Sequence, residues 1–113
     1  MRVIISIFIC LFFAISTNGQ QQKPVTVKIS TPTVQCEKCK KRIEDYMKVE
    51  EGVLKTVVDF KQKRTTVTYL LDRTNLENIK TAIANCGYDA EDVKAEPDMY
   101  AKLPTCCKKP ADQ

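Results

Sequence analysis

Histidine is absent from this chain of 113 residues, and a second Cys-x-x-Cys motif is absent as well. The lack of histidine excludes catalysis that depends on a histidine base. It also means that a tetrahedral zinc site would need four cysteines, which would have to come from distant parts of the sequence. We therefore expect a binding protein rather than an enzyme.

Aromatic residues are missing from the most basic part of the chain. The formal net charge is +4, and basic residues cluster at Lys38, Lys40, Lys41 and Arg42. A basic run without interleaved aromatic residues is typical of a solvated helix face rather than of a nucleic-acid-binding surface. We expect no nucleic acid among the partners of this protein.

No apolar run is long enough for a typical membrane span. Residues 3–16 are mostly apolar, follow Arg2 and precede a small and polar segment. A transmembrane helix needs about 20 apolar residues, so this order instead indicates a secretory signal peptide over residues 1–19. Cleavage is expected after Gly19 or, alternatively, after Ser16. The mature protein would then be periplasmic or secreted, without stable insertion into the membrane.

The cysteines do not add up to a closed set of disulfides. Of six cysteines, Cys10 lies in the predicted signal peptide, so the mature chain keeps five: Cys36, Cys39, Cys86, Cys106 and Cys107. An odd number cannot be paired completely within one chain. Because regularly spaced apolar residues suffice for a modest core, we expect the thiols to serve chemistry rather than scaffolding.

Alternating and helical apolar patterns predict one domain over residues 25–95 with the element order βαββαβ. The predicted strands cover residues 25–30, 54–60, 65–71 and 88–95, and the predicted helices cover residues 37–49 and 76–86. Two helices on one face of a four-stranded antiparallel sheet make an α+β, ferredoxin-like sandwich. Residues 20–24 are expected to be a flexible lead-in, and residues 96–113 a cysteine-containing tail.

The same patterns assign side chains to faces of these elements. The two helices are expected to bury the apolar sets Cys39, Ile43, Tyr46, Met47 and Leu76, Ile79, Ile83, Cys86. One face of the second strand should carry Leu54, Thr56, Val58 and Phe60. A capping box that starts at Thr74 and includes Glu77 should open the second helix.

Cys36 and Cys39 form a Cys-x-x-Cys pair in a loop that runs into the first predicted helix. Two thiols at this spacing suit a soft ion that accepts two or three sulfur ligands, such as Cu(I) or Hg(II). The helix N-terminus and the neighbouring basic residues favour the thiolate forms. From the residues alone, a reducible disulfide without a metal role is the alternative interpretation.

The stretch 25–90 resembles a heavy-metal-associated domain, the module of copper chaperones, copper-transporting P-type ATPases and the periplasmic mercury-binding protein. The segments that carry the resemblance are CEKC at 36–39, Ile43, GV at 52–53, VTY at 67–69 and GYDA at 87–90. It implies that Cys36 and Cys39 are the metal ligands. It also implies that the ion is Cu(I) as the first candidate and Hg(II) as the second, with Zn(II) as a further candidate. It further implies delivery to a metal-transporting membrane protein or another metal-binding domain. Val34 and Thr33 depart from the family's usual Met and Gly and leave the identity of the ion open.

Cys86, Cys106 and Cys107 are candidate additional ligands. In a ferredoxin-like sheet the end of the first strand and the start of the fourth lie together, which brings Cys86 toward the pair. Cys86 is then a ligand, a disulfide partner or a small hydrophobic core residue. Four interpretations are open for the two tail cysteines: docking over the metal, binding of a second ion, pairing with other cysteines, or a place in a frayed tail.

We predict that the tail folds back over the metal end of the domain. Residues 96–105 reach about 33 Å when extended, whereas the first strand spans only about 23 Å. The tail can therefore cross the length of the sheet, and burial of Tyr100 and Leu103 would hold it down.

A thiol–disulfide exchange module is the alternative function. Such proteins need a larger βαβ framework and a proline that faces the active thiols, which this element order does not provide. A purely structural secreted domain would leave the Cys-x-x-Cys motif unexplained. The leading interpretation is an exported carrier or scavenger of a soft metal ion.

Overall fold

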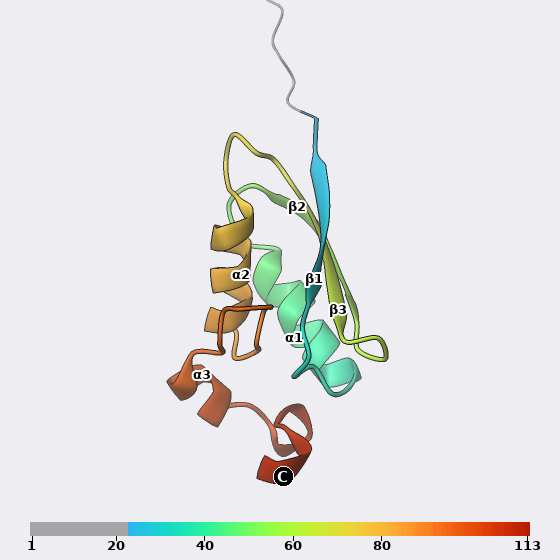
Figure 1. Cartoon of the computed structure of the whole chain (residues 1–113), viewed down its shortest axis with the longest axis vertical. Helices are drawn as coiled ribbons and strands as arrows, with labels where there is room; N and C mark the ends of the chain where they lie inside the picture. Colours follow the sequence, from blue (N-terminus) through green and yellow to red (C-terminus); the bar gives the residue numbers. More distant parts are fainter. Residues whose placement is uncertain (1–22) are drawn as a thin grey trace, which may run out of the picture.

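A computed structural model describes residues 23–113 of the chain (Figure 1). Its elements are β1 (Val25–Ser30), α1 (Glu37–Met47), β2 (Val53–Asp59), β3 (Arg64–Tyr69), α2 (Leu76–Asn85), α3 (Pro97–Ala101) and the 3₁₀ turns η2 (Thr105–Cys107) and η3 (Pro110–Asp112). The predicted signal peptide and Gln20 to Gln22 lie outside the described residues. Within residues 23–113, no helix has both the length and the apolar character needed to cross a membrane.

The three strands form one antiparallel sheet in the order β1-β3-β2. The central strand β3 places Val67 opposite Val27 of β1 and Thr56 of β2. Both long helices cover the same face of this sheet (Figure 1). The predicted α+β, ferredoxin-like fold is therefore confirmed.

The residues expected to form a fourth strand, 88–95, make a tight turn instead. Glu91 adopts a left-handed backbone conformation with φ of 53°, and Ala90 and Val93 bridge to each other rather than to the sheet. The segment touches β1 through one backbone hydrogen bond, in which the Glu91 N–H donates to the Ser30 carbonyl at 2.8 Å. The four-stranded sheet of the sequence prediction is thus a three-stranded sheet within the described residues.

Ion pairs on α2 account for this turn. The ammonium group of Lys80, whose side chain is only 8% exposed, lies 2.9 Å from Asp92 and 3.7 Å from Glu91. A nearly buried ammonium group needs such partners. The two ion pairs therefore hold the turn against the helix.

The helices bury the faces that their spacing predicts. Cys39, Ile43 and Met47 of α1 are fully buried, and Ile79 and Ile83 of α2 are at most 1% exposed. Their ends differ slightly from the prediction. The helix α1 ends at Met47 rather than at Val49. The cap of α2 is Asn75 rather than Thr74, and its side chain accepts a hydrogen bond from the Asn78 N–H.

The prediction for Leu54 is wrong, because β2 carries an irregularity in its pairing. The register with β3 shifts between Val53 and Lys55, so that the extra residue points outward and the alternation resumes beyond it. Leu54 is 55% exposed, while Val53 packs against the core. The rest of the predicted face holds, since Val58 is buried and Phe60 packs against the core.

The tail, residues 96–113, is folded and follows the turn at 88–95, and it reaches the predicted place by a different route. Leu103 is 4% exposed and Cys107 is fully buried in the core, with Tyr100 packed against it. The chain does not cross the sheet, because the Glu96 N–H donates to the Ala84 carbonyl at 2.9 Å. The tail therefore starts beside the C-terminal end of α2 and lies below the start of α1 (Figure 1). The frayed-tail alternative is excluded.

Gly87 follows the end of α2 and lies against the tail. Its replacement therefore reports on how the tail is docked. Its φ is +107°, and a Cβ atom there would lie 3.1 Å from a Leu103 methyl group and 3.2 Å from the Met99 carbonyl oxygen. We expect Gly87→Ala to lower the free energy of unfolding by about 1 to 3 kcal/mol, because the backbone is strained for any other residue. Urea denaturation measures this. Thr81→Ala, at an exposed position of the same helix, is the control and should change stability by less than about 0.5 kcal/mol. An equally small effect at residue 87 would contradict the assigned packing.

Candidate metal centre

The loop between β1 and α1 is held in place by hydrogen bonds to β3 and to the neighbouring turn. The Thr31 N–H donates to the Lys63 carbonyl at 2.9 Å, and the buried hydroxyl groups of Thr31 and Thr65 lie 3.0 Å apart. The Lys63 ammonium group donates to the Val34 carbonyl. These contacts fix the path of the chain into α1.

The two residues that depart from the usual family pattern have structural roles in this loop. The Thr33 hydroxyl accepts a hydrogen bond from the Asp89 N–H at 3.0 Å, with both residues buried. Val34 is fully buried in the core. A glycine in place of Thr33 would lack the hydroxyl, so this chain ties the loop to the segment after α2 in a way that glycine cannot.

Cys36 and Cys39 lie together at the start of α1. Cys36 is the N-cap residue of the helix, and its sulfur is 3.6 Å from that of Cys39. Cys36 is half-buried and Cys39 is fully buried. The structure therefore brings together the two thiols that the sequence singles out.

The surroundings of Cys36 favour its thiolate. Partial burial would by itself raise the pKa of the Cys36 thiol, but hydrogen bonds from the Cys39 backbone and thiol, the Lys38 backbone and Cys106 outweigh it. Together they lower the pKa of Cys36 to about 7. These are the donors expected at a helix N-terminus, which stabilises negative charge.

The tail brings two further thiols to the same place. The Cys107 sulfur is 4.0 Å from that of Cys36 and 4.0 Å from that of Cys106. The sulfurs of these three cysteines all lie within 4.8 Å of one another. Cys106 is exposed, whereas Cys107 is buried. Burial is the main cause that raises the pKa of Cys107, and the nearby Cys39 thiol is the second.

Cys86 stands apart from this group. It is 4% exposed, and its thiol donates to the Arg42 carbonyl oxygen at 3.8 Å. Burial raises the pKa of the Cys86 thiol to about 11. Of the alternatives for this residue, the placement fits a core cysteine that behaves as a small hydrophobic side chain. All five cysteines within residues 23–113 are free thiols.

Tyr88, in the segment GYDA at 87–90, adjoins the thiols, a placement that the sequence analysis does not anticipate. Its side chain is fully buried, and its hydroxyl has no hydrogen-bond partner among the described residues. Burial, together with the adjoining thiols of Cys39 and Cys107, raises the pKa of Tyr88, which stays a neutral phenol. A buried tyrosine hydroxyl usually finds a partner. The only sequence signal for this role is its position directly after the glycine that ends α2.

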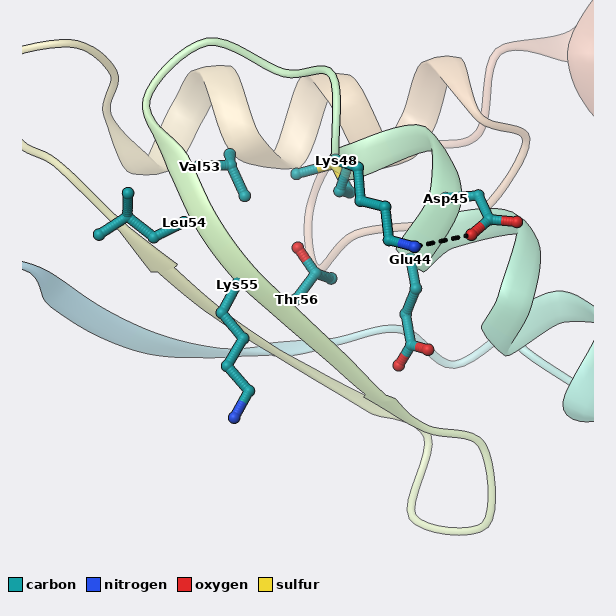
Figure 2. A pocket seen from close by; sticks show the side chains of 8 residues that line it. Glu44, Asp45, Lys48, Val53, Leu54, Lys55 and Thr56 are labelled. Atoms are coloured by element: carbon teal, nitrogen blue, oxygen red, sulfur yellow. Dashed lines mark hydrogen bonds and ion pairs between the residues drawn. The ribbon is translucent and has the colours of Figure 1, made fainter.

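A groove beside α1 is a separate feature. It has a volume of about 280 Å³, lies between α1 and β2, and no cysteine lines it (Figure 2). It is lined by Glu44, Asp45 and Met47 of α1, by Lys48 directly after the helix, and by residues 53–56. Lys48 and Asp45 pair with each other at 3.4 Å. The thiols therefore lie outside this groove.

Comparisons with known proteins agree with this arrangement. The mercuric transport protein periplasmic component of Shewanella putrefaciens is 29% identical over 76 residues, which cover 67% of this chain and 84% of that protein. The copper-exporting P-type ATPase of Staphylococcus haemolyticus is 33% identical over 67 residues, which cover 59% of this chain but only 8% of the ATPase.

A solved structure shows the same fold. Oxidized MerP from Ralstonia metallidurans CH34 superposes with a TM-score of 0.57 at 28% identity, over 60% of this chain and 94% of that protein. The sequence pattern of the heavy-metal-associated domain matches residues 28–89, which is more than half of the chain. This chain belongs to the heavy-metal-associated domain family.

Proposed function

We propose that this protein is an exported carrier or scavenger of a soft metal ion, held by Cys36 and Cys39, and not an enzyme. The observation that carries the proposal is the pair of sulfurs 3.6 Å apart at the start of α1. One of the pair is partly open to solvent and has a pKa of about 7. A metal ion binds the thiolate rather than the thiol, so Cys36 gives up its proton to a soft ion readily.

Cu(I) is the first candidate for the ion and Hg(II) the second. Both accept two or three sulfur ligands, which suits a site with no histidine. The names of two relatives, a mercuric transport protein and a copper-exporting ATPase, support the same two ions. Zn(II) prefers four ligands and is the weaker candidate. Native mass spectrometry of the reduced protein with each ion in turn distinguishes them.

Transfer of the ion proceeds by ligand exchange between thiols. A thiolate from the partner adds to the bound ion, and Cys39 or Cys36 then leaves and regains a proton. The ion is never free in solution during this exchange. The half-buried position of Cys36 suits it for contact with the partner. A metal-transporting membrane protein or another metal-binding domain is the expected recipient.

Thiol–disulfide exchange is the second candidate function, because a low pKa at the first cysteine of a Cys-x-x-Cys motif also suits redox chemistry. The two functions separate in one assay. A carrier binds one equivalent of the ion when reduced and does not speed the reduction of insulin disulfides. An exchange module speeds that reduction and does not bind the ion stoichiometrically.

Replacing both ligands tests the metal site. We expect Cys36→Ser together with Cys39→Ser to lower the affinity for Cu(I) at least 100-fold, measured by competition with a Cu(I) chelator. The control is Cys86→Ser, which removes a thiol outside the group and should keep the original affinity. Full Cu(I) affinity in the double variant would refute the proposed function.

The pKa of Cys36 predicts its reactivity. A thiol with a pKa of about 7 is half ionised at pH 7, whereas an ordinary thiol is only about 3% ionised there. We expect iodoacetamide to modify Cys36 with a rate that rises with pH and reaches half its maximum near pH 7. Below that pH the thiol regains its proton and the rate falls. Peptide mass mapping follows the modification, and a midpoint above about pH 8.5 would contradict the assigned hydrogen bonds.

Export is tested at the N-terminus of the purified protein. Removal of a signal peptide should leave a mature chain that begins at Gln20, in a periplasmic or secreted fraction. N-terminal sequencing and cell fractionation measure both. Recovery of intact Met1 in the membrane fraction would rule out the predicted processing.

A further inference from the structure

The tail is fastened to the domain by contacts that do not involve the thiols. Leu103 is 4% exposed and packs beside Gly87. At the start of the tail, the Glu96 N–H donates to the Ala84 carbonyl of α2 at 2.9 Å. Within the tail, the Lys109 N–H donates to the Tyr100 hydroxyl at 3.0 Å, and that hydroxyl donates to the Asp112 carboxylate. The two tail cysteines are therefore presented to the metal centre by a folded segment, and their closeness to Cys36 does not rest on one weak contact.

The spacing of three sulfurs suits a single ion. The centre of a triangle of three sulfurs that are each about 4 Å apart lies about 2.3 Å from every sulfur. This distance is the usual length of a bond between zinc and a thiolate. The separations Cys36–Cys107 and Cys106–Cys107 are both 4.0 Å, and the third is within 4.8 Å. Small side-chain movements would therefore bring all three sulfurs into bonding distance of one soft ion.

A polar group is also aimed at this cluster without a partner of its own. The buried Tyr88 hydroxyl adjoins the thiols of Cys39 and Cys107 and makes no hydrogen bond in the described part of the chain. Its O–H can donate to a sulfur that carries negative charge when an ion is bound. A buried thiolate needs such compensation, since burial disfavours the charged form.

We propose that Cys106 and Cys107 join Cys36 to form a closed, three-sulfur site for the same soft ion that the Cys36–Cys39 pair first binds. This inference rests on the proposed function and extends it. Cys36 belongs to both sets of ligands, so the ion moves from one to the other without dissociating. The protein is then a trap that releases its ion slowly, rather than a two-thiol carrier open to solvent.

The step from the pair to the closed site is a ligand exchange without any change of oxidation state. Bonds form from the sulfurs of Cys107 and Cys106 to the ion, and their protons go to solvent. The bond from Cys39 to the ion breaks, and Cys39 takes up a proton. No oxidant or reductant is needed, because each thiol that binds is matched by a proton released.

The experiment counts the sulfurs around the ion in the reduced full chain loaded with one equivalent of Cu(I), and separately of Hg(II), by X-ray absorption spectroscopy. We expect three sulfurs in the unaltered protein and in Cys39→Ser. We expect two sulfurs in the double variant Cys106→Ser with Cys107→Ser. The double variant should also release the ion to a competing chelator at least tenfold faster, with Cys86→Ser as the matched control that leaves the rate unchanged.

Loss of the buried Cys107 thiol can also disturb the packing of the tail, so a second variant keeps the test decisive. Cys106 is exposed, and Cys106→Ser should leave thermal unfolding unchanged while release becomes at least threefold faster. Two sulfurs in the unaltered protein, or release from Cys106→Ser at the rate of the Cys86→Ser control, would overturn the closed site. A two-sulfur ion that still depends on Cys36 and Cys39 would leave the proposed function standing, so the two failures are distinguishable.

Discussion

The thiol site depends on the way the loop between β1 and α1 is tied to the rest of the domain. The buried pair of Thr31 and Thr65 joins it to β3, and the Thr33 hydroxyl joins it to the Asp89 backbone after α2. Because the loop cannot move freely, Cys36 stays at the N-cap of α1 and within reach of Cys39. The low pKa of Cys36 follows from this fixed position at the start of the helix.

The turn in place of a fourth strand has a direct consequence for function. A full strand along β1 would carry the chain to the far end of the sheet, away from the thiols. The ion pairs of Lys80 with Asp92 and Glu91 reverse the chain early instead. The tail consequently begins next to α2 and needs only a short path to place Cys107 at 4.0 Å from Cys36.

The thiols differ in how readily they ionise, and this difference suggests an order of events. Cys36 has a pKa of about 7 because backbone and thiol hydrogen bonds outweigh its partial burial. Burial dominates at Cys107 and raises its pKa. In the proposed site, a soft ion arriving from solvent would meet the more readily ionised thiol at Cys36, whereas Cys107 would lose its proton to a metal already bound nearby. The proposal thus makes the half-buried thiol the point of arrival and assigns the buried thiol to the closed state.

The sequence by itself determined the local features: the helix faces of Ile43 and Ile83, the α+β class, and the Cys-x-x-Cys pair at a helix start. These depend on the periods of strands and helices and on residues three or four apart, which a linear pattern records. Only the tertiary structure decided the outward turn of Leu54, the loss of the fourth strand and the route by which the tail reaches Cys36. Each of these arises from contacts between residues far apart in the chain, whose packing and charge pairing no local pattern encodes.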